Sequence, residues 1–206
     1  CGGCTFQNLD YYEQIAAKEI QIKDVFQRIG HIDNVTCEKI IGCDEIFHYR
    51  NKMEFTFSNS EYVPEREKGR ESVDFVLGLH APGRCDKVLN IDECYIQSPI
   101  ANKILYSIKK LTRELKPYNI REHIGFIRNV IIRTAYNTND IMINIVTTKE
   151  DTEILRSVID ALIIEFPNIT SIVNNITNRK AGVSTGEHQI VLYGNEYILE
   201  KIGKYK

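Results

Sequence analysis

The chain has 206 residues, of which 43% are hydrophobic and 26% charged, as in proteins that bury one large core or two small ones. Its formal net charge of −2 excludes a generic polybasic nucleic-acid binder, so an RNA-binding site would have to be a local patch. No apolar run approaches the roughly 20 residues that span a bilayer, and the polar, glycine-rich start does not resemble a secretory signal, so we expect a cytoplasmic protein.

The first predicted element is a helix over residues 9–29, because apolar residues recur there at helical spacing. Asp10 followed by Glu13 resembles a capping box at its start, and Gly30 suits its end. The apolar period of this segment therefore predicts one amphipathic helix.

A strand over residues 49–58 follows, because its side chains alternate between an apolar and a polar face. Phe55 and Phe57 lie on the apolar face, while Arg50 and Lys52 lie on the polar one. Two cations two residues apart on a strand point the same way, so they are candidates to hold neighbouring phosphates. The alternative is an ordinary solvated face of a sheet.

The remaining chain predicts an exposed charged loop, two strands around a Pro82-Gly83 turn, a helix capped by Ser98, a hairpin, another helix and three closing strands. In chain order these elements cover residues 59–71, 73–79, 87–91, 98–116, 127–136, 141–148, 150–166, 171–176, 189–192 and 197–202. Hairpin-like connections favour antiparallel pairing. We therefore expect an α+β fold, a mainly antiparallel sheet with helices packed on it.

Six cysteines occur, and a long, charged chain without a secretory signal favours free thiols over disulfides. Cys1-Gly2-Gly3-Cys4 is typical of half a metal site, because the glycines let both sulfurs face one metal. A redox pair would have a strand before it and a helix from its second cysteine. Cys94, at a strand-to-helix junction, is the third candidate ligand, and the other three cysteines are interpreted as ordinary packing or turn residues.

Arg128 and Arg133 lie on opposite faces of a regular strand, so we expect one to contact RNA and the other to pair within the protein. Arg84, beside the Pro82-Gly83 turn, is a further candidate RNA contact. The chain contains no glycine-rich phosphate loop and no hydrolase or metalloprotease motif, so we predict no catalytic residue in it.

Five blocks in order resemble the central region of the bacterial 23S ribosomal RNA (uracil-5-)-methyltransferases, which are S-adenosylmethionine-dependent enzymes. They are the Cys-Gly-Gly-Cys start at 1–9, the Tyr-Arg-Asn-Lys block at 49–55, and the blocks at 78–94, 123–133 and 171–194. The resemblance implies an enzyme with an RNA-binding β-barrel, a central domain with a [4Fe–4S] cluster, and a C-terminal domain that binds S-adenosylmethionine. Its thiolate and base act on C6 and C5 of uracil from that C-terminal domain.

By this resemblance the chain is the central part alone, without the β-barrel and the S-adenosylmethionine domain. Cys1, Cys4 and Cys94 correspond to three of four cluster ligands, and the chain, which begins without methionine, is expected to have been cut after the first. We expect the chain alone to be inactive and to lose the cluster easily. Ribosomal RNA is the expected partner.

Within the central part, residues 1–4 are expected to begin the cluster site, residues 5–35 to form a helix that packs on the missing catalytic domain, and residues 36–203 to form the α+β domain. A cluster that joins distant segments suits a structural role. Two alternatives remain open: an independent metal-binding or redox module, and a plain RNA-binding module with salt-dependent affinity.

Overall fold

The computed structural model describes residues 1–180 and 186–206 and divides into two compact units. The larger unit comprises Cys1–Gly3 and His48–Lys206, and the smaller unit comprises Cys4–Phe47. The division at Phe47 differs from the predicted one, because the segment after residue 35 bonds to the smaller unit's helix. For example, the Ile40 amide donates to the Glu19 carboxylate at 3.0 Å.

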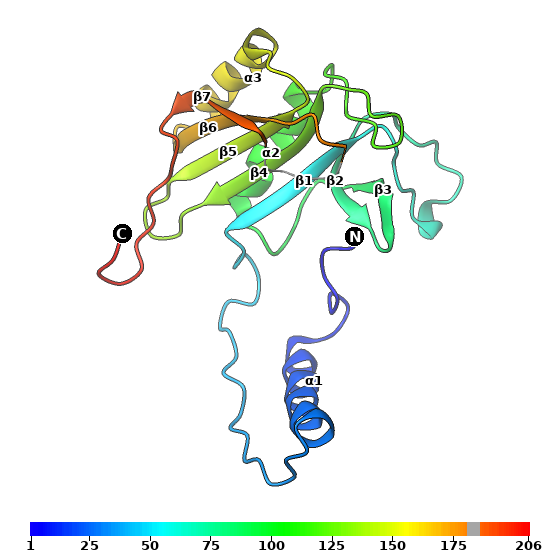
Figure 1. The fold of residues 1–206 in the computed structure, drawn as a ribbon, viewed down its shortest axis with the longest axis vertical. Coiled ribbons are helices and arrows are strands. Elements are labelled where there is room, and N and C mark those ends of the chain that lie inside the picture. Colours follow the sequence, from blue (N-terminus) through cyan, green and yellow to red (C-terminus); the bar gives the residue numbers. More distant parts are fainter. Residues whose placement is uncertain (181–185) are drawn as a thin grey trace. The chain divides into compact units, whose positions relative to one another are not determined.

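The larger unit is built on a seven-stranded sheet with the strand order β3-β2-β1-β4-β5-β6-β7 (Figure 1). The strands are β1 (Lys52–Ser58), β2 (Val76–Ala81), β3 (Arg84–Asn90), β4 (Ile127–Thr134), β5 (Ile141–Thr147), β6 (Ile169–Ile176) and β7 (His188–Gly194). Helices α2 (Pro99–Leu111) and α3 (Thr152–Glu165) share one hydrophobic core with the sheet. The α+β prediction is therefore confirmed.

Neighbouring strands pair antiparallel except β5 and β6, which are parallel. Helix α3 connects β5 to β6 and carries the chain back to the end of the sheet where β5 begins. The two strands therefore run in the same direction. The expected, mainly antiparallel sheet is therefore confirmed, and β5 with β6 is the single parallel pair among the described strands.

The alternation of β1 positions the sheet against the helices. Met53, Phe55 and Phe57 are buried in the core with Ile104 and Ile108 of α2. The side chains between them on β1 must point to the opposite face of the sheet, since successive residues of a strand alternate. We call this the outer face, and it carries Glu54 and Thr56.

Three predicted boundaries hold in detail. The Ser98 hydroxyl caps α2 by accepting the Ala101 amide at 3.4 Å, as predicted. Pro82 and Gly83 form the β2–β3 turn, and Gly83 has a φ of +68°, which glycine adopts without strain. The hairpin between β4 and β5 is also confirmed.

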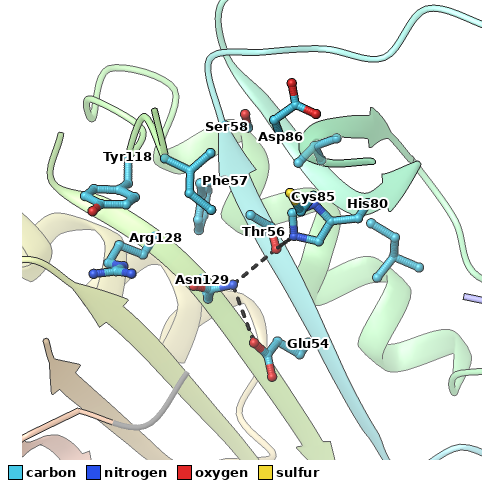
Figure 2. A pocket seen from close by; sticks show the side chains of 13 residues that line it. Glu54, Thr56, Phe57, Ser58, His80, Cys85, Asp86, Tyr118, Arg128 and Asn129 are labelled. Carbon is cyan, nitrogen blue, oxygen red and sulfur yellow. Dashed lines mark hydrogen bonds between the residues drawn. The ribbon is translucent and has the colours of Figure 1, made fainter. Parts of the chain in front are cut away.

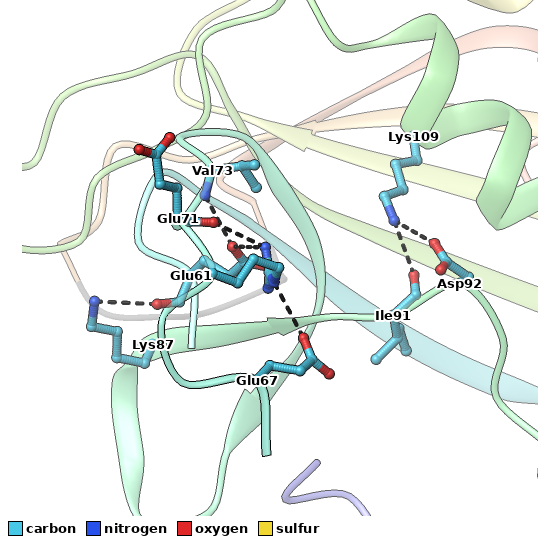
Figure 3. Close-up of polar contacts among 9 residues, drawn as sticks. Glu61, Glu67, Glu71, Val73, Lys87, Ile91, Asp92 and Lys109 are labelled. Carbon is cyan, nitrogen blue, oxygen red and sulfur yellow. Dashed lines mark hydrogen bonds and ion pairs between the residues drawn. The ribbon is translucent and has the colours of Figure 1, made fainter. Parts of the chain in front are cut away.

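The segment 59–71 is not simply an exposed loop, as predicted, because Glu61 is 4% exposed within it (Figure 3). Its carboxylate accepts two hydrogen bonds from Arg70, at 2.8 and 3.2 Å, and one from the Val73 amide at 2.9 Å. The Lys87 ammonium donates to the Glu61 carbonyl oxygen at 3.2 Å. A short 3₁₀ helix, Glu65–Glu67, lies inside the same segment. The charged segment therefore contains a buried carboxylate whose ion-pair partner, Arg70, is partly exposed.

The predicted helix over residues 98–116 ends earlier, at Leu111, where the Thr112 hydroxyl donates to the Ile108 carbonyl oxygen at 2.7 Å. The predicted strand over residues 197–202 is wrong. Side-chain bonds tie this segment to the β4–β5 turn, where the Glu200 carboxylate accepts the Asn137 amide at 3.0 Å. No ladder forms there among the described residues.

The smaller unit contains α1 (Tyr11–Asp24), which continues as a π-helix (Val25–Ile29) to Gly30. The Asp10 carboxylate caps α1 by accepting the Tyr12 amide at 2.9 Å, so the predicted start is confirmed. No residue from 4 to 47 is buried, so this unit has no hydrophobic core of its own. Among the described residues, no helix has the length and apolar character that crossing a membrane requires.

Candidate nucleic-acid interface

The outer face of the sheet carries a hollow of about 240 Å³ within the larger unit (Figure 2). Strands β1 and β4 form its floor. The β2–β3 hairpin forms one wall with His80, Cys85 and Asp86, and Tyr118 with Ile120 forms the other, from the segment before β4. The hollow therefore combines segments that are far apart in the chain.

A row of polar side chains crosses the floor. Asn129 on β4 lies opposite Thr56 on β1, and its amide donates to the Thr56 hydroxyl oxygen at 3.2 Å and to Glu54 Oε1 at 3.5 Å. The Thr56 hydroxyl is 3.3 Å from His80 Nε2. These contacts, seen in Figure 2, fix the orientation of all four side chains across three neighbouring strands.

Arg128 also lines the hollow, because the register of β4 against β5 shifts between Ile127 and Asn129. This irregularity overturns the expectation that Arg128 and Arg133 lie on opposite faces of a regular strand. Arg128 is 3% exposed, and its guanidinium lies 4.1 Å from the centre of the Tyr118 ring.

The same guanidinium donates to the carbonyl oxygens of Thr177 and Arg179, at 3.2 and 2.7 Å. Burial lowers the pKa of Arg128. This arginine pairs internally and holds the Tyr118 wall against the segment after β6, so it is not placed to meet a ligand phosphate from solvent.

At the rim of the hollow, Asp86 lies between two arginines. Arg84 donates two hydrogen bonds to its carboxylate, at 3.0 and 3.1 Å, and Arg121 donates a third. The hydrogen bonds from Arg84 and Arg121 hold the pKa of Asp86 far below its usual range. The side chain of Arg84 is 50% exposed and that of Arg121 is 70% exposed. The rim therefore carries two accessible cations, and the single carboxylate of Asp86 balances only one of their charges.

The structure brings Lys52 and Arg133 together, because they are register partners on β1 and β4. Lys52 shares the outer face with Thr56, and Arg133 shares it with Asn129, since each pair is an even number of residues apart. Both cations are exposed. Arg50 is also exposed, and its Nε donates to the Lys52 carbonyl oxygen at 3.0 Å. The RNA contacts predicted at these three residues remain predictions.

The predicted metal ligands are divided between the two compact units, with Cys1 and Cys94 in the larger and Cys4 in the smaller. Cys94 is half-buried, and its backbone exchanges hydrogen bonds of 2.9 and 3.1 Å with the Asn102 amide. Cys1 is exposed, and Cys4 belongs to the smaller unit. No group of three metal-ligating side chains occurs among the described residues, and three thiols are one short of the four that a [4Fe–4S] cluster takes.

The other three cysteines, interpreted as ordinary packing or turn residues, are not fully buried. Cys43 and Cys85 are exposed, and Cys37 is half-buried. Cys43 Sγ lies 3.0 Å from the Glu45 carbonyl oxygen, while Cys85 lines the hollow. Cys85 therefore lies on the edge strand β3 and is exposed, instead of packing or lying in the turn.

Sequence reasoning did not identify Thr56, His80 or Asn129 as members of one site. The available signal was Asn129, a polar amide directly before the apolar run of residues 130–132. Its partners could not be named, because Thr56 is 73 residues away in the chain and is brought near only by strand pairing.

No protein-family model matches the chain. A protein of Chlorobaculum tepidum named as an uncharacterized RNA methyltransferase is 32% identical over 210 residues, which cover 98% of this chain and 44% of that protein. A protein of Halalkalibacterium halodurans with the same description is 34% identical over 208 residues, which cover 100% of this chain and 43% of that protein. The chain therefore spans less than half the length of these curated relatives, which are named as RNA methyltransferases.

The fold is also found in a solved structure. The crystal structure of Pyrococcus abyssi tRNA (uracil-54, C5)-methyltransferase in complex with S-adenosyl-L-homocysteine matches with a TM-score of 0.70 at 22% identity. The match covers 99% of this chain and 43% of that one. At this identity the likeness shows a shared fold, and it places the whole chain within one part of that longer protein.

Proposed function

We propose that this chain is part of an RNA (uracil-5-)-methyltransferase, which transfers a methyl group from S-adenosylmethionine to C5 of a uridine in ribosomal RNA. The observation that carries the proposal is the match of nearly the whole chain, at 32 and 34% identity, to proteins named as RNA methyltransferases. The fold shared with an enzyme named for the C5 position of a tRNA uracil supports the reaction type.

In this proposal the chain contributes RNA contacts, and segments of the longer protein outside it bind S-adenosylmethionine and perform methyl transfer. A thiolate adds to C6 of the uracil, and C5 takes the methyl group from S-adenosylmethionine, which leaves as S-adenosylhomocysteine. A base then removes the C5 proton as the thiolate leaves C6, which restores the double bond. The outer face of the sheet supplies the RNA contacts through Lys52 and Arg133, which place two cations at one position.

A [4Fe–4S] cluster is proposed for the longer protein only, with Cys1, Cys4 and Cys94 as three ligands and a cysteine outside this chain as the fourth. The described residues alone do not fit the cluster, so no step of the reaction is assigned to it. Iron and sulfide analysis of the longer protein, purified without oxygen, tests this part independently of activity. A protein that is fully active without iron would remove the cluster from the proposal.

The reaction is tested with RNA that carries tritium at C5 of uridine, because methylation at C5 releases that proton to water. The longer protein is incubated with S-adenosylmethionine and transcripts of ribosomal and transfer RNA. We expect tritium release from ribosomal RNA, and none from the 206-residue chain alone. Release from transfer RNA only would correct the substrate. Absence of release from every RNA, with an intact protein, would overturn the proposal.

An RNA-binding module without methyltransferase activity is the second candidate, and the Lys52–Arg133 pair is the observation that favours it. It predicts that the chain binds RNA with salt-dependent affinity while the longer protein releases no tritium. The same preparation therefore separates the two functions.

A further inference from the structure

We propose that the outer face binds a single-stranded stretch of the RNA substrate, with a phosphate on Lys52 and Arg133 and an unpaired guanine base in the hollow. This inference rests on the proposed function, since it names how the same RNA is held. It assigns the specificity of this part of the protein to a base other than the methylated uridine.

The phosphate position follows from an unusual pairing. Like charges directly opposite each other on adjacent strands destabilise a sheet, yet Lys52 and Arg133 are register partners on the outer face. Neither forms an ion pair with another described side chain. An anion between the two cations would remove the repulsion, and the phosphate of an RNA backbone is such an anion.

The interior of the hollow excludes phosphate. The Glu54 carboxylate lies on its floor without a cationic partner among the described residues and would repel a phosphate. Asp86 at the rim is already neutralised by Arg84 and Arg121. The Arg128 guanidinium also lines the hollow, but it is bonded to backbone carbonyl oxygens and is 3% exposed, so it does not offset this repulsion.

Leu79, Val88 and Ile120 give the hollow apolar walls, which suit the faces of a planar ring. A neutral, flat molecule with polar edges therefore fits this space, and a nucleobase has that character.

The side chains on the floor of the hollow favour a base edge that carries hydrogen-bond donors. The Asn129 amide group already donates to Glu54 and Thr56, so the floor offers mainly acceptors. Within the described part of the chain, no hydrogen bond reaches Glu54 Oε2 or Asn129 Oδ1. Guanine presents two adjacent donors, N1–H and the N2 amino group, which match a carboxylate that accepts two parallel bonds. Uracil presents a single N–H on its corresponding edge.

The two positions belong to one strand of RNA. Lys52 and Thr56 are four residues apart on β1, which corresponds to about 13 Å along the strand. Phosphate and base of one short single-stranded segment can therefore occupy both places. The exposed cations Arg84 and Arg121 lie at the rim of the hollow, where the backbone leaves it.

The test measures binding of fluorescein-labelled pentanucleotides to the longer protein by anisotropy at one fixed salt concentration. The probes are UUGUU, UUIUU with inosine, which lacks the N2 amino group, and UUUUU. We expect UUGUU to bind about tenfold more tightly than the other two, which is the effect of one matched polar contact to a base. Glu54→Gln should reduce this preference to less than about threefold. Glu153→Gln, on the exposed surface of α3, is the matched control and should retain it.

A wild-type protein that binds the three probes equally would overturn the guanine assignment, and so would an unchanged preference in Glu54→Gln. If circular dichroism shows that Glu54→Gln does not fold, His80→Ala replaces it. His80 is exposed at the wall, and its loss should weaken UUGUU binding several-fold. Tritium release from the same preparation separates the two proposals. Methylation without guanine preference would reject guanine binding in the hollow and leave the proposed reaction intact. Guanine preference without methylation would reject the proposed reaction.

Discussion

The Glu61 carboxylate gives the sharpest stability prediction. Burial by itself raises its pKa, but the hydrogen bonds from Arg70 and the Val73 amide outweigh burial and hold the pKa below the ordinary value of 4.5. The ionised form is therefore favoured in the folded protein. Its contribution to stability is present above pH 4.5 and is lost as the pH falls through the folded pKa.

The substitution Glu61→Gln keeps the size of the side chain and removes the charge. The new side chain would also turn an amide group toward donors that need an acceptor. Three hydrogen bonds converge on the native carboxylate, whose side chain is 1% exposed, while that of Arg70 is 41% exposed. Because solvent around Arg70 weakens the ion pair, while the buried carboxylate strengthens it, we expect the free energy of unfolding to decrease by about 2 kcal/mol at neutral pH. For a domain of this size, that corresponds to a decrease in melting temperature of roughly 4–8 °C.

The assay is urea denaturation of the wild type and the variant at neutral pH and at pH values below the ordinary pKa of a glutamate. The gap in unfolding free energy should be largest at neutral pH and should shrink as the wild-type carboxyl becomes protonated. Hydrogen exchange at the Val73 amide should accelerate in the variant, because that amide donates to Glu61. Glu65→Gln is the control, since its ion pair with Lys68 is exposed and should have no measurable effect. A gap that is independent of pH would refute the reasoning.

Two further predictions test the core and the outer face. Phe55→Ala should lower the free energy of unfolding, measured by urea denaturation, by about 3–5 kcal/mol, because Phe55 is fully buried on β1 and the lost ring leaves a cavity. A decrease below about 1 kcal/mol would contradict the core described above. Arg133→Gln should reduce the slope of log affinity against log salt for single-stranded RNA by about 0.7, the loss of one phosphate contact. Arg156→Gln on α3 is its control, and equal slopes in both variants would remove Arg133 from the interface.

The sequence predicts those features of the fold that depend on residues close together in the chain. The alternation of β1 is a local property, and it correctly placed Phe55 and Phe57 in the core. The capping of α1 by Asp10 and of α2 by Ser98 was also predictable, because each cap bonds within three residues of itself. The charged composition of residues 59–71 predicted an exposed loop, and this was wrong at Glu61. The sequence does not show that Arg70 and the Val73 amide compensate the burial of its carboxylate.

The candidate site was less predictable. Regular alternation places Arg128 and Arg133 on opposite faces, but the register shift in β4 turns Arg128 into the hollow beside Asn129. A shift of register depends on how two strands pair, and neither strand encodes it alone. The same holds for Lys52, whose partner Arg133 is specified by the pairing of β1 with β4.

The sequence by itself determined the α+β class, the helix caps, the core face of β1 and the resemblance to RNA methyltransferases, because these depend on local periodicity and on residue blocks in order. Only the tertiary structure decided that Glu61 is buried, that Arg128 pairs internally, and that Thr56 and Asn129 share the floor of a hollow. These contacts join segments that are distant in the chain, so their geometry exists only after the strands have paired.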